Sequence, residues 1–232
     1  ILTGDPGRVG KIASYLDEAT YLGENREYKS YLGKISNIQV LVISTGMGGP
    51  AMAICVEELK KIGIETLIRV GTSGGMQLDV EAGDLVVATG AVREEGTSEE
   101  YVPMEFPAVA DIEVSNALIA SAKELNIKYH YGIVHCKDSF YGQHDPERMP
   151  ASKELLEKWD AWIKAGVLCS EMETASLFVV SSILKLKAGA VLSVIWNQER
   201  EKRGLDQKQD FDTDTEIQVA IRAIEKLEIR NE

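Results

Sequence analysis

Cysteine, basic residues and long apolar runs are all scarce in this sequence. Only 3 of its 232 residues are cysteines, and 25 lysines and arginines stand against 37 acidic residues, for a net charge of −12. Nucleic acids and acidic membranes both require a basic face, so this balance argues against both as partners, although it allows a local basic pocket. No apolar run reaches the length of a transmembrane helix, and we expect no signal peptide.

The three cysteines, Cys55, Cys136 and Cys169, lie within apolar runs. An odd number in such positions favours reduced core side chains in a cytoplasmic protein over a disulfide framework. The sequence begins abruptly at Ile1, inside a stretch typical of the end of a strand, so we expect that some N-terminal residues are missing.

Hydrophobic residues make up 44% of the chain and charged residues 27%, as in a globular protein with a substantial core. Apolar runs of strand length alternate with helical patterns, and no repeat or linker interrupts them. This alternation predicts a single α/β sandwich domain over residues 1–232. The clearest buried strands are expected at 39–45, 66–70, 84–89, 129–136 and 188–196.

Local signals also predict where helices begin and what they bury. Asp111 is expected to cap one helix, and Thr213 with Glu216 forms a capping-box pattern before the last helix. Trp159 and Trp162 lie in an amphipathic helical pattern, and we expect both in the core.

The stretch 67–75 combines a short buried strand with an end rich in glycine and hydroxyl groups. Glycine lets backbone N–H groups approach a ligand, the hydroxyls of Thr72 and Ser73 add donors, and Arg69 supplies a forked, permanent charge. A phosphate site and a plain turn with Arg69 in a structural ion pair explain this pattern equally well. The glycine turn before Arg8 is a second candidate anion site, for which an ordinary strand–helix turn is the favoured explanation.

The segment after the strand at 129–136 is rich in aromatic and planar polar groups. Phe140 could stack on a flat heterocycle, while Gln143 and Arg148 could bind its edge by hydrogen bonds. An exposed connection is the alternative.

Two carboxylates, Glu171 and Glu173, flank Met172 immediately before an apolar helix. Burying ionised glutamate is costly unless it is paired, and a ligand with vicinal hydroxyls would satisfy it. The helix dipole alone accounts for one of these acids more readily than for both.

Taken together, these segments resemble the nucleoside phosphorylase superfamily of the trimeric or hexameric type, and its uridine-cleaving branch most closely. The resemblance rests on GDPGR at 4–8, NREY at 25–28, STGMGGP at 44–50, RVGTSGG at 69–75, DSFYGQ at 138–143 and SEMET at 170–174. It implies a three-layer α/β/α sandwich with a central mixed, partly barrel-like sheet. It also implies that phosphate cleaves uridine to uracil and ribose 1-phosphate.

The resemblance gives each matching residue a role. Phosphate would be bound by Gly4, Arg8, Arg69, Thr72 and, from a neighbouring subunit, Arg26. Ribose would be bound by Glu171, Met172, Glu173 and Phe140. The base would be bound by Phe140, Gln143, Arg148, Ile195 and Trp196. The expected catalytic residues are Arg69, Arg148, Gln143 and Glu173.

Inorganic phosphate would be a co-substrate, and we expect no cofactor. Some relatives hold an intersubunit potassium ion with a serine where this chain has Ala51, so we predict no metal. A site shared through Arg26 requires at least a dimer, and the resemblance implies a homohexamer.

The sequence departs from the family pattern at several positions. Purine-cleaving relatives place an acidic aspartate after the last core strand, where this chain has Asn197, which favours a pyrimidine. Gln198 stands where an arginine often supports the base site, and Arg148 follows Gln143 by five residues instead of two. The N-terminal histidine that a neighbouring subunit usually lends to ribose is absent from this sequence.

Other functions fit parts of the sequence. A purine phosphorylase or a hydrolytic nucleosidase could share the fold, although a nucleosidase would lack the arginines. Ser73 lies in a G-x-S-x-G pattern of serine hydrolases, but the following residues 76–83 are turn-like where such a nucleophile must open a helix. The glycines at 46 and 48 match a dinucleotide fingerprint only weakly. A non-catalytic nucleotide-binding module is the remaining alternative.

Overall fold

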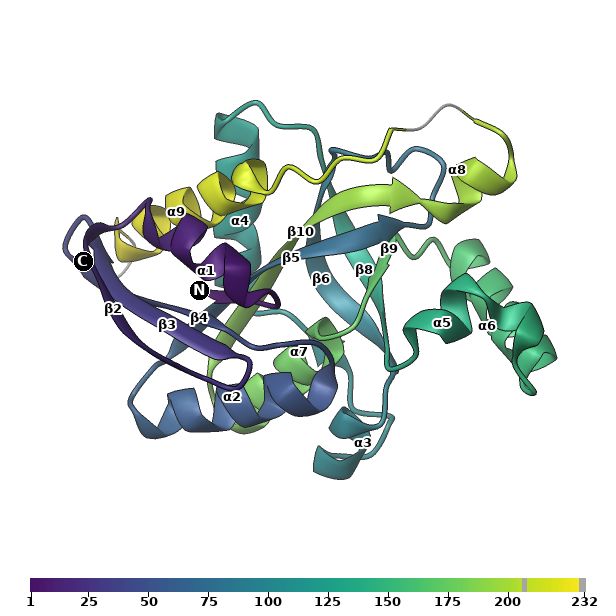
Figure 1. Ribbon diagram of the computed structural model, residues 1–232, viewed down its shortest axis with the longest axis horizontal. Helices are drawn as coiled ribbons and strands as arrows, with labels where there is room; N and C mark the ends of the chain where they lie inside the picture. Colours follow the sequence, from purple (N-terminus) through teal and green to yellow (C-terminus); the bar gives the residue numbers. More distant parts are fainter. Residues whose placement is uncertain (206–207, 230–232) are drawn as a thin grey trace.

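The computed structural model describes residues 1–205 and 208–229, which form a mixed α/β structure in three layers (Figure 1). One ten-stranded sheet forms the middle layer of the described chain. Its strands are β1 (Leu2–Thr3), β2 (Asp17–Asn25), β3 (Tyr28–Ile35), β4 (Ile38–Ser44), β5 (Thr66–Gly75), β6 (Leu85–Glu94), β7 (Ala108–Val109), β8 (Tyr129–Lys137), β9 (Cys169–Glu171) and β10 (Lys187–Asn197). The helices are α1 (Pro6–Ala13), α2 (Gly49–Lys61), α3 (Thr97–Tyr101), α4 (Ile112–Glu124), α5 (Phe140–His144), η1 (Pro146–Arg148), α6 (Ser152–Lys164), α7 (Thr174–Ile183), α8 (Gln198–Lys202) and α9 (Asp214–Ile229).

The sheet is mixed, and half of it closes on itself. Its strand order is β10-β6-β8-β9-β5-β1-β4-β3-β2, and β10 also pairs with β5. The strands β10, β6, β8, β9 and β5 therefore form a closed, barrel-like ring, from which β1, β4, β3 and β2 extend as an open sheet. The β5–β10 and β6–β8 pairs are parallel, whereas β10–β6 and β5–β9 are antiparallel. The predicted fold class is confirmed.

Helices cover both faces of the sheet because each presents an apolar stripe to it. Figure 1 shows α1, α4 and α9 on one side and α2 with α7 on the other. The first group buries Ile12, Leu118 and Ile217 against the sheet, and the second buries Met52 and Phe178. Burying one such side chain contributes about 1.5–3 kcal/mol to folding, so packing of both helix layers stabilises the barrel-like part of the sheet.

The approach of α4 to the sheet depends on a glycine and on a capping residue. A Cβ at Gly189 of β10 would lie 2.4 Å from Val114 Cγ1, so a larger residue would push α4 away. The carboxylate of Asp111 accepts hydrogen bonds from the backbone N–H groups of Glu113 and Val114 at 2.9 and 3.0 Å. The predicted cap is confirmed.

Two predictions about side chains are wrong. Trp159 and Trp162 lie on α6, which has no buried residue, and their indole N–H groups donate to Glu199 and Glu94 at 2.8 and 3.1 Å. Glu216 forms no capping box, since its side chain is fully buried and its carboxylate oxygens have no hydrogen-bond partner. In both cases tertiary packing overrides the local pattern.

The cysteines are free and buried, as predicted. Burial raises the pKa of Cys55 and of Cys169 to about 12, so both thiols stay protonated and unreactive at neutral pH. Within the described ranges, no helix has the length and apolar character needed to span a bilayer.

Candidate active site

A cavity of about 800 Å³ lies where the carboxyl ends of β5 and β10 meet the turns that follow β1 and β4. This volume suits a small organic ligand. The cavity wall contains ten of the residues predicted from the sequence, namely Gly4, Arg8, Arg69, Thr72, Phe140, Glu171, Met172, Glu173, Ile195 and Trp196. Parallel pairing of β1, β5 and β10 brings these distant segments to one edge, and antiparallel β9 delivers Glu171 beside them.

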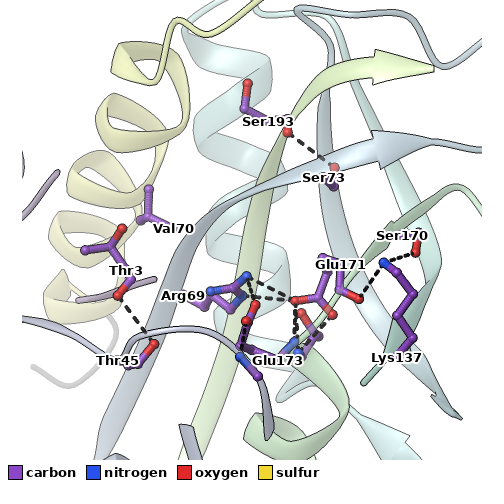
Figure 2. A network of polar contacts seen from close by, with 12 residues as sticks. Thr3, Thr45, Arg69, Val70, Ser73, Lys137, Ser170, Glu171, Glu173 and Ser193 are labelled. Carbon is purple, nitrogen blue, oxygen red and sulfur yellow. Dashed lines mark hydrogen bonds and ion pairs between the residues drawn. The ribbon is translucent and has the colours of Figure 1, made fainter. Parts of the chain in front are cut away.

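Arg69 lies at the centre of the polar wall, with a side chain that is 4% exposed (Figure 2). Its Nη2 is 2.5 Å from Glu173 Oε2 and 3.1 Å from Glu171 Oε2, and its Nε donates to Glu171 Oε2 at 3.2 Å. Its Nη1 is buried and has no hydrogen-bond partner. An unsatisfied buried donor costs about 1–3 kcal/mol or more, so Arg69 retains one nitrogen that favours an anionic ligand.

The two carboxylates differ in their surroundings. Burial alone would raise the pKa of Glu171, but Arg69 and the N–H groups of Glu173 and Thr174 lower it. Burial raises the pKa of Glu173, with Arg69 opposing that effect. Glu173 accepts one further bond, from the backbone N–H of Gly48 at 2.6 Å. Glu171 thus accepts from two backbone N–H groups and Glu173 from one, so Glu173 is the carboxylate better suited to exchange partners with ligand hydroxyls.

Arg8 approaches the same cavity from α1. Its Nη1 donates to Thr3 Oγ1 at 3.2 Å and to Val70 O at 3.5 Å. Burial lowers the pKa of Arg8, and the nearby Glu216 opposes that shift. The α1 N-terminus is already capped by Asp5, whose carboxylate accepts from Gly7 N at 2.7 Å. The positive charge on this side of the cavity therefore comes from the arginine and not from a free helix end.

Three predicted residues lie outside the cavity wall. Arg26 is exposed in the turn between β2 and β3, with a φ of +54°. The Arg148 side chain is 56% exposed, and its Nε lies 2.6 Å from Asp145 Oδ2. Gln143 is buried behind Ser170, whose hydroxyl donates to Gln143 Oε1 at 2.7 Å, and Gln143 Nε2 donates to Gln198 Oε1 at 3.2 Å.

The apolar end of the cavity is an aromatic cluster. The ring of His144 lies 4.2 Å from that of Phe140 and 5.7 Å from that of Trp196, measured between centroids. Burial lowers the pKa of His144, and Lys137 adds to this effect. A neutral imidazole between two aromatic rings suits a flat, uncharged heterocycle.

Sequence reasoning missed Lys137, His144 and Ser170, which all line the cavity. A signal for Lys137 exists in the strand: His135 and Lys137 are two residues apart at the end of β8, so they share one face of it. Both side chains are almost completely buried, and both contact Ser170 Oγ at 2.9 Å. Two buried polar residues on one strand face should have indicated a polar site there.

Asn197 is fully engaged in local structure. Its Nδ2 donates to Gln77 O and Val80 O at 2.8 and 2.7 Å, while its Oδ1 accepts from the N–H groups of Glu199 and Arg200 at 2.9 Å each. The side chain is completely buried, and it caps α8. Such a residue anchors the end of β10 and offers no acid to a ligand.

Ser73 does not have the setting of a hydrolase nucleophile. It lies within β5, its hydroxyl donates to Ser193 O at 3.3 Å, and the chain continues through turns toward β6. The described residues also contain no group of histidine, cysteine, aspartate and glutamate side chains that could hold a metal ion.

Comparison with known proteins agrees with this architecture. The model of the family described as "Phosphorylase superfamily" matches residues 1–228. The uridine phosphorylase of Treponema pallidum is 52% identical over 98% of this chain and 88% of its own length. The uridine phosphorylase of Thermococcus kodakarensis is 45% identical over 88% of this chain and 74% of its own length. The guanosine phosphorylase of Halorubrum lacusprofundi is 40% identical over 85% of this chain and 77% of its own length. A family match over nearly the whole sequence, on a barrel-like α/β sheet with a buried arginine–glutamate cavity, shows that this chain belongs to the phosphorylase superfamily.

Proposed function

We propose that this chain cleaves uridine with inorganic phosphate and releases uracil and ribose 1-phosphate. The observation that carries the proposal is Arg69, which lines the cavity and pairs through Nη2 with Glu173 while its buried Nη1 has no hydrogen-bond partner. Phosphate would take the free arginine nitrogen, and ribose hydroxyls would exchange hydrogen bonds with Glu173. Several relatives named uridine phosphorylase support this choice of substrate.

The arrangement suits a displacement at the anomeric carbon. One phosphate oxygen forms a bond to C1′ as the C1′–N1 bond breaks, and the bonding electron pair passes into the uracil ring, mainly to O2. The sugar is positively charged in the transition state, so a phosphate held beneath C1′ both attacks and stabilises it. Arg8, Arg69 and Thr72 would hold this anion, and Phe140, Ile195 and Trp196 would enclose the base.

The geometry around Asn197 favours a pyrimidine over a purine. Purine cleavage benefits from an acid that protonates the ring, whereas Asn197 is buried among backbone groups and cannot supply a proton. The relative named guanosine phosphorylase makes purine cleavage the alternative to test.

Two further features belong to the proposal. We infer that the enzyme works as an oligomer, at least a dimer and by family resemblance a hexamer, because Arg26 projects from an exposed hairpin turn where a neighbouring subunit could receive it. We also infer that phosphate is the sole co-substrate and that no cofactor or metal takes part. Dialysis against a chelator in a buffer that contains sodium and no potassium should leave the rate unchanged.

The test is release of base from uridine, inosine and guanosine, each with and without inorganic phosphate. Uracil release that requires phosphate, with both purine nucleosides inert, is the expected result. Release without phosphate would instead identify a hydrolytic nucleosidase, and cleavage of inosine or guanosine would overturn the choice of base.

A further inference from the structure

Lys137, at the end of β8, is a buried cation that lines the cavity. The residue is 6% exposed, and its Nζ donates to Ser170 Oγ at 2.9 Å and to Glu171 O at 3.5 Å. Figure 2 shows it reaching toward Ser170 beside Glu171. Both acceptors are uncharged. Burial lowers the pKa of Lys137, whereas the carboxylates of Glu171 and Glu173, which both pair with Arg69, favour its charged form. A buried ammonium whose own acceptors are a hydroxyl and a carbonyl is stabilised further when an additional negative charge in the cavity faces it.

Ser170 fixes the direction in which this cation points. A serine hydroxyl has one proton to donate and two lone pairs, and an ammonium can only donate. The Ser170 proton goes to Gln143 Oε1, so Lys137 Nζ occupies a lone pair of the same oxygen. His135 Nδ1 also contacts this oxygen, and its Nε2 lies 2.6 Å from Glu94 Oε2, which anchors the network from behind.

Lys137 lines the same cavity as the aromatic cluster that suits the base. Lys137 precedes Phe140 by three residues, and the cavity wall that contains Lys137 also contains the Phe140–His144–Trp196 cluster. The effect of Lys137 on the pKa of His144, secondary to that of burial, reflects the proximity of the two side chains. Arg148, which the sequence suggested for this end, pairs instead with Asp145 at the surface.

We propose that Lys137 is a catalytic residue whose ammonium stabilises the negative charge that uracil acquires as the C1′–N1 bond breaks. This inference rests on the proposed function. The electron pair of that bond moves to N1 and is delocalised onto O2, while the new bond forms between C1′ and a phosphate oxygen. Lys137 transfers no proton in this step. Ser170 is a positioning residue that holds both Lys137 and the Gln143 amide.

The test compares substrates whose leaving groups differ in their need for stabilisation. Fluorine at the 5-position of uracil withdraws electrons and stabilises the anion. The departure of 5-fluorouracil therefore depends less on stabilisation by the protein. In Lys137→Met, kcat/KM for uridine should fall by roughly 100- to 1,000-fold, as when one preorganised donor to a developing anion is removed. The loss for 5-fluorouridine should be at least ten-fold smaller, and KM for phosphate should change by less than about two-fold. Lys137→Arg should recover part of the uridine rate.

Lys128→Met is the matched control, because Lys128 stands before the other end of β8 with an exposed side chain that pairs with Glu81 and with the buried Asp84. Its kinetics should equal those of the wild type. If Lys137→Met lowers kcat/KM equally for both substrates, Lys137 has only a structural role. A selective rise in KM for phosphate would indicate that Lys137 binds phosphate and not the base. The wild-type arm tests the proposed function separately, since it must release uracil only with phosphate.

A second measurement needs no variant and so does not depend on the folding of Lys137→Met. 5-Nitrouracil ionises below neutral pH, and it reports whether the base end of the wild-type cavity prefers an anion. Binding should tighten at least ten-fold as the pH rises through its ionisation, with phosphate present throughout. Tighter binding of the neutral form would contradict a cation at the base.

Discussion

The pKa of Glu216 provides a test of how burial and charge act behind the cavity. The side chain of Glu216 on α9 is completely buried, its carboxylate oxygens have no hydrogen-bond partner, and Arg8 and Lys11 are cations that act on it. Burial raises its pKa from 4.5 to about 7, with Arg8 opposing the shift. The folded protein therefore binds this proton more tightly than the unfolded chain does.

The sign and size of the effect on stability follow from linkage. Between pH 4.5 and about 7 the folded state carries more protons at this site, so its contribution to the free energy of unfolding falls as pH rises and levels off above pH 7. At about 1.4 kcal/mol per pKa unit, the full contribution is about 3 kcal/mol, of which roughly 2.5 kcal/mol is lost between pH 5 and pH 8. Glu216→Gln keeps the shape and removes the titration.

Urea unfolding of wild type and Glu216→Gln at pH 5 and pH 8 measures this contribution. The stability of the variant relative to the wild type should rise by about 2–3 kcal/mol between the two pH values. Glu225→Gln, which removes a surface partner of Arg222 on the same helix, should shift stability by less than about 1 kcal/mol at both. An unchanged difference for Glu216→Gln would mean that Glu216 is already ionised in the fold, and it would refute the reasoning.

Three further substitutions test the assigned roles. Arg8→Met should raise KM for phosphate by roughly 10- to 100-fold, because phosphate loses a hydrogen bond to a charged group, whereas Arg222→Met at the surface should leave this KM unchanged. Equal KM values for the two variants would show that Arg8 does not bind phosphate. Glu173→Gln should lower kcat/KM for uridine at least about ten-fold more than for 2′-deoxyuridine, because a ribose hydroxyl is its expected partner; parallel losses would argue against that contact. Asn197→Asp should lower the free energy of unfolding measured in urea by about 3 kcal/mol, because a carboxylate would face two carbonyl oxygens. Uridine cleavage should persist in this variant. Complete loss of turnover in the folded variant would contradict a purely structural role for Asn197.

Much of the cavity could be predicted from the sequence because its parts are contiguous segments at strand ends. The strand pattern before Arg69 located β5, and the glutamates around Met172 marked a polar entrance to an apolar helix. What joins them is the β5–β9 pairing, Gly74 with Ser170, and no local pattern encodes that register.

The base end of the cavity was less predictable for a physical reason. Arg148 has the chemistry to bind a uracil edge, but it lies three residues from Asp145 in a short 3₁₀ turn and pairs with it at the surface. Lys137 shares one face of β8 with His135, which indicates a polar site, but only the fold shows that its neighbours are Ser170 and Glu171. The choice between these two cations depends on tertiary contacts.

The same limit explains Glu216. Thr213 and Glu216 have the spacing of a capping box, but Glu216 is buried where Arg8 and Lys11 approach it, and the Thr213 hydroxyl accepts a hydrogen bond from Lys11 at 3.0 Å. Packing of α9 against α1 decides these partners, and this contact joins segments about two hundred residues apart.

The central claim is that phosphate, and not water, attacks the sugar, and ³¹P NMR of the products tests it most directly. Enzyme, uridine and inorganic phosphate should produce a new phosphoester resonance, that of ribose 1-phosphate, in step with uracil and at the expense of free phosphate. Arg8→Met should slow its appearance, and Arg222→Met should not. Uracil accompanied by free ribose, with the phosphate resonance unchanged, would contradict the assignment of Arg8 and Arg69 to a reacting phosphate.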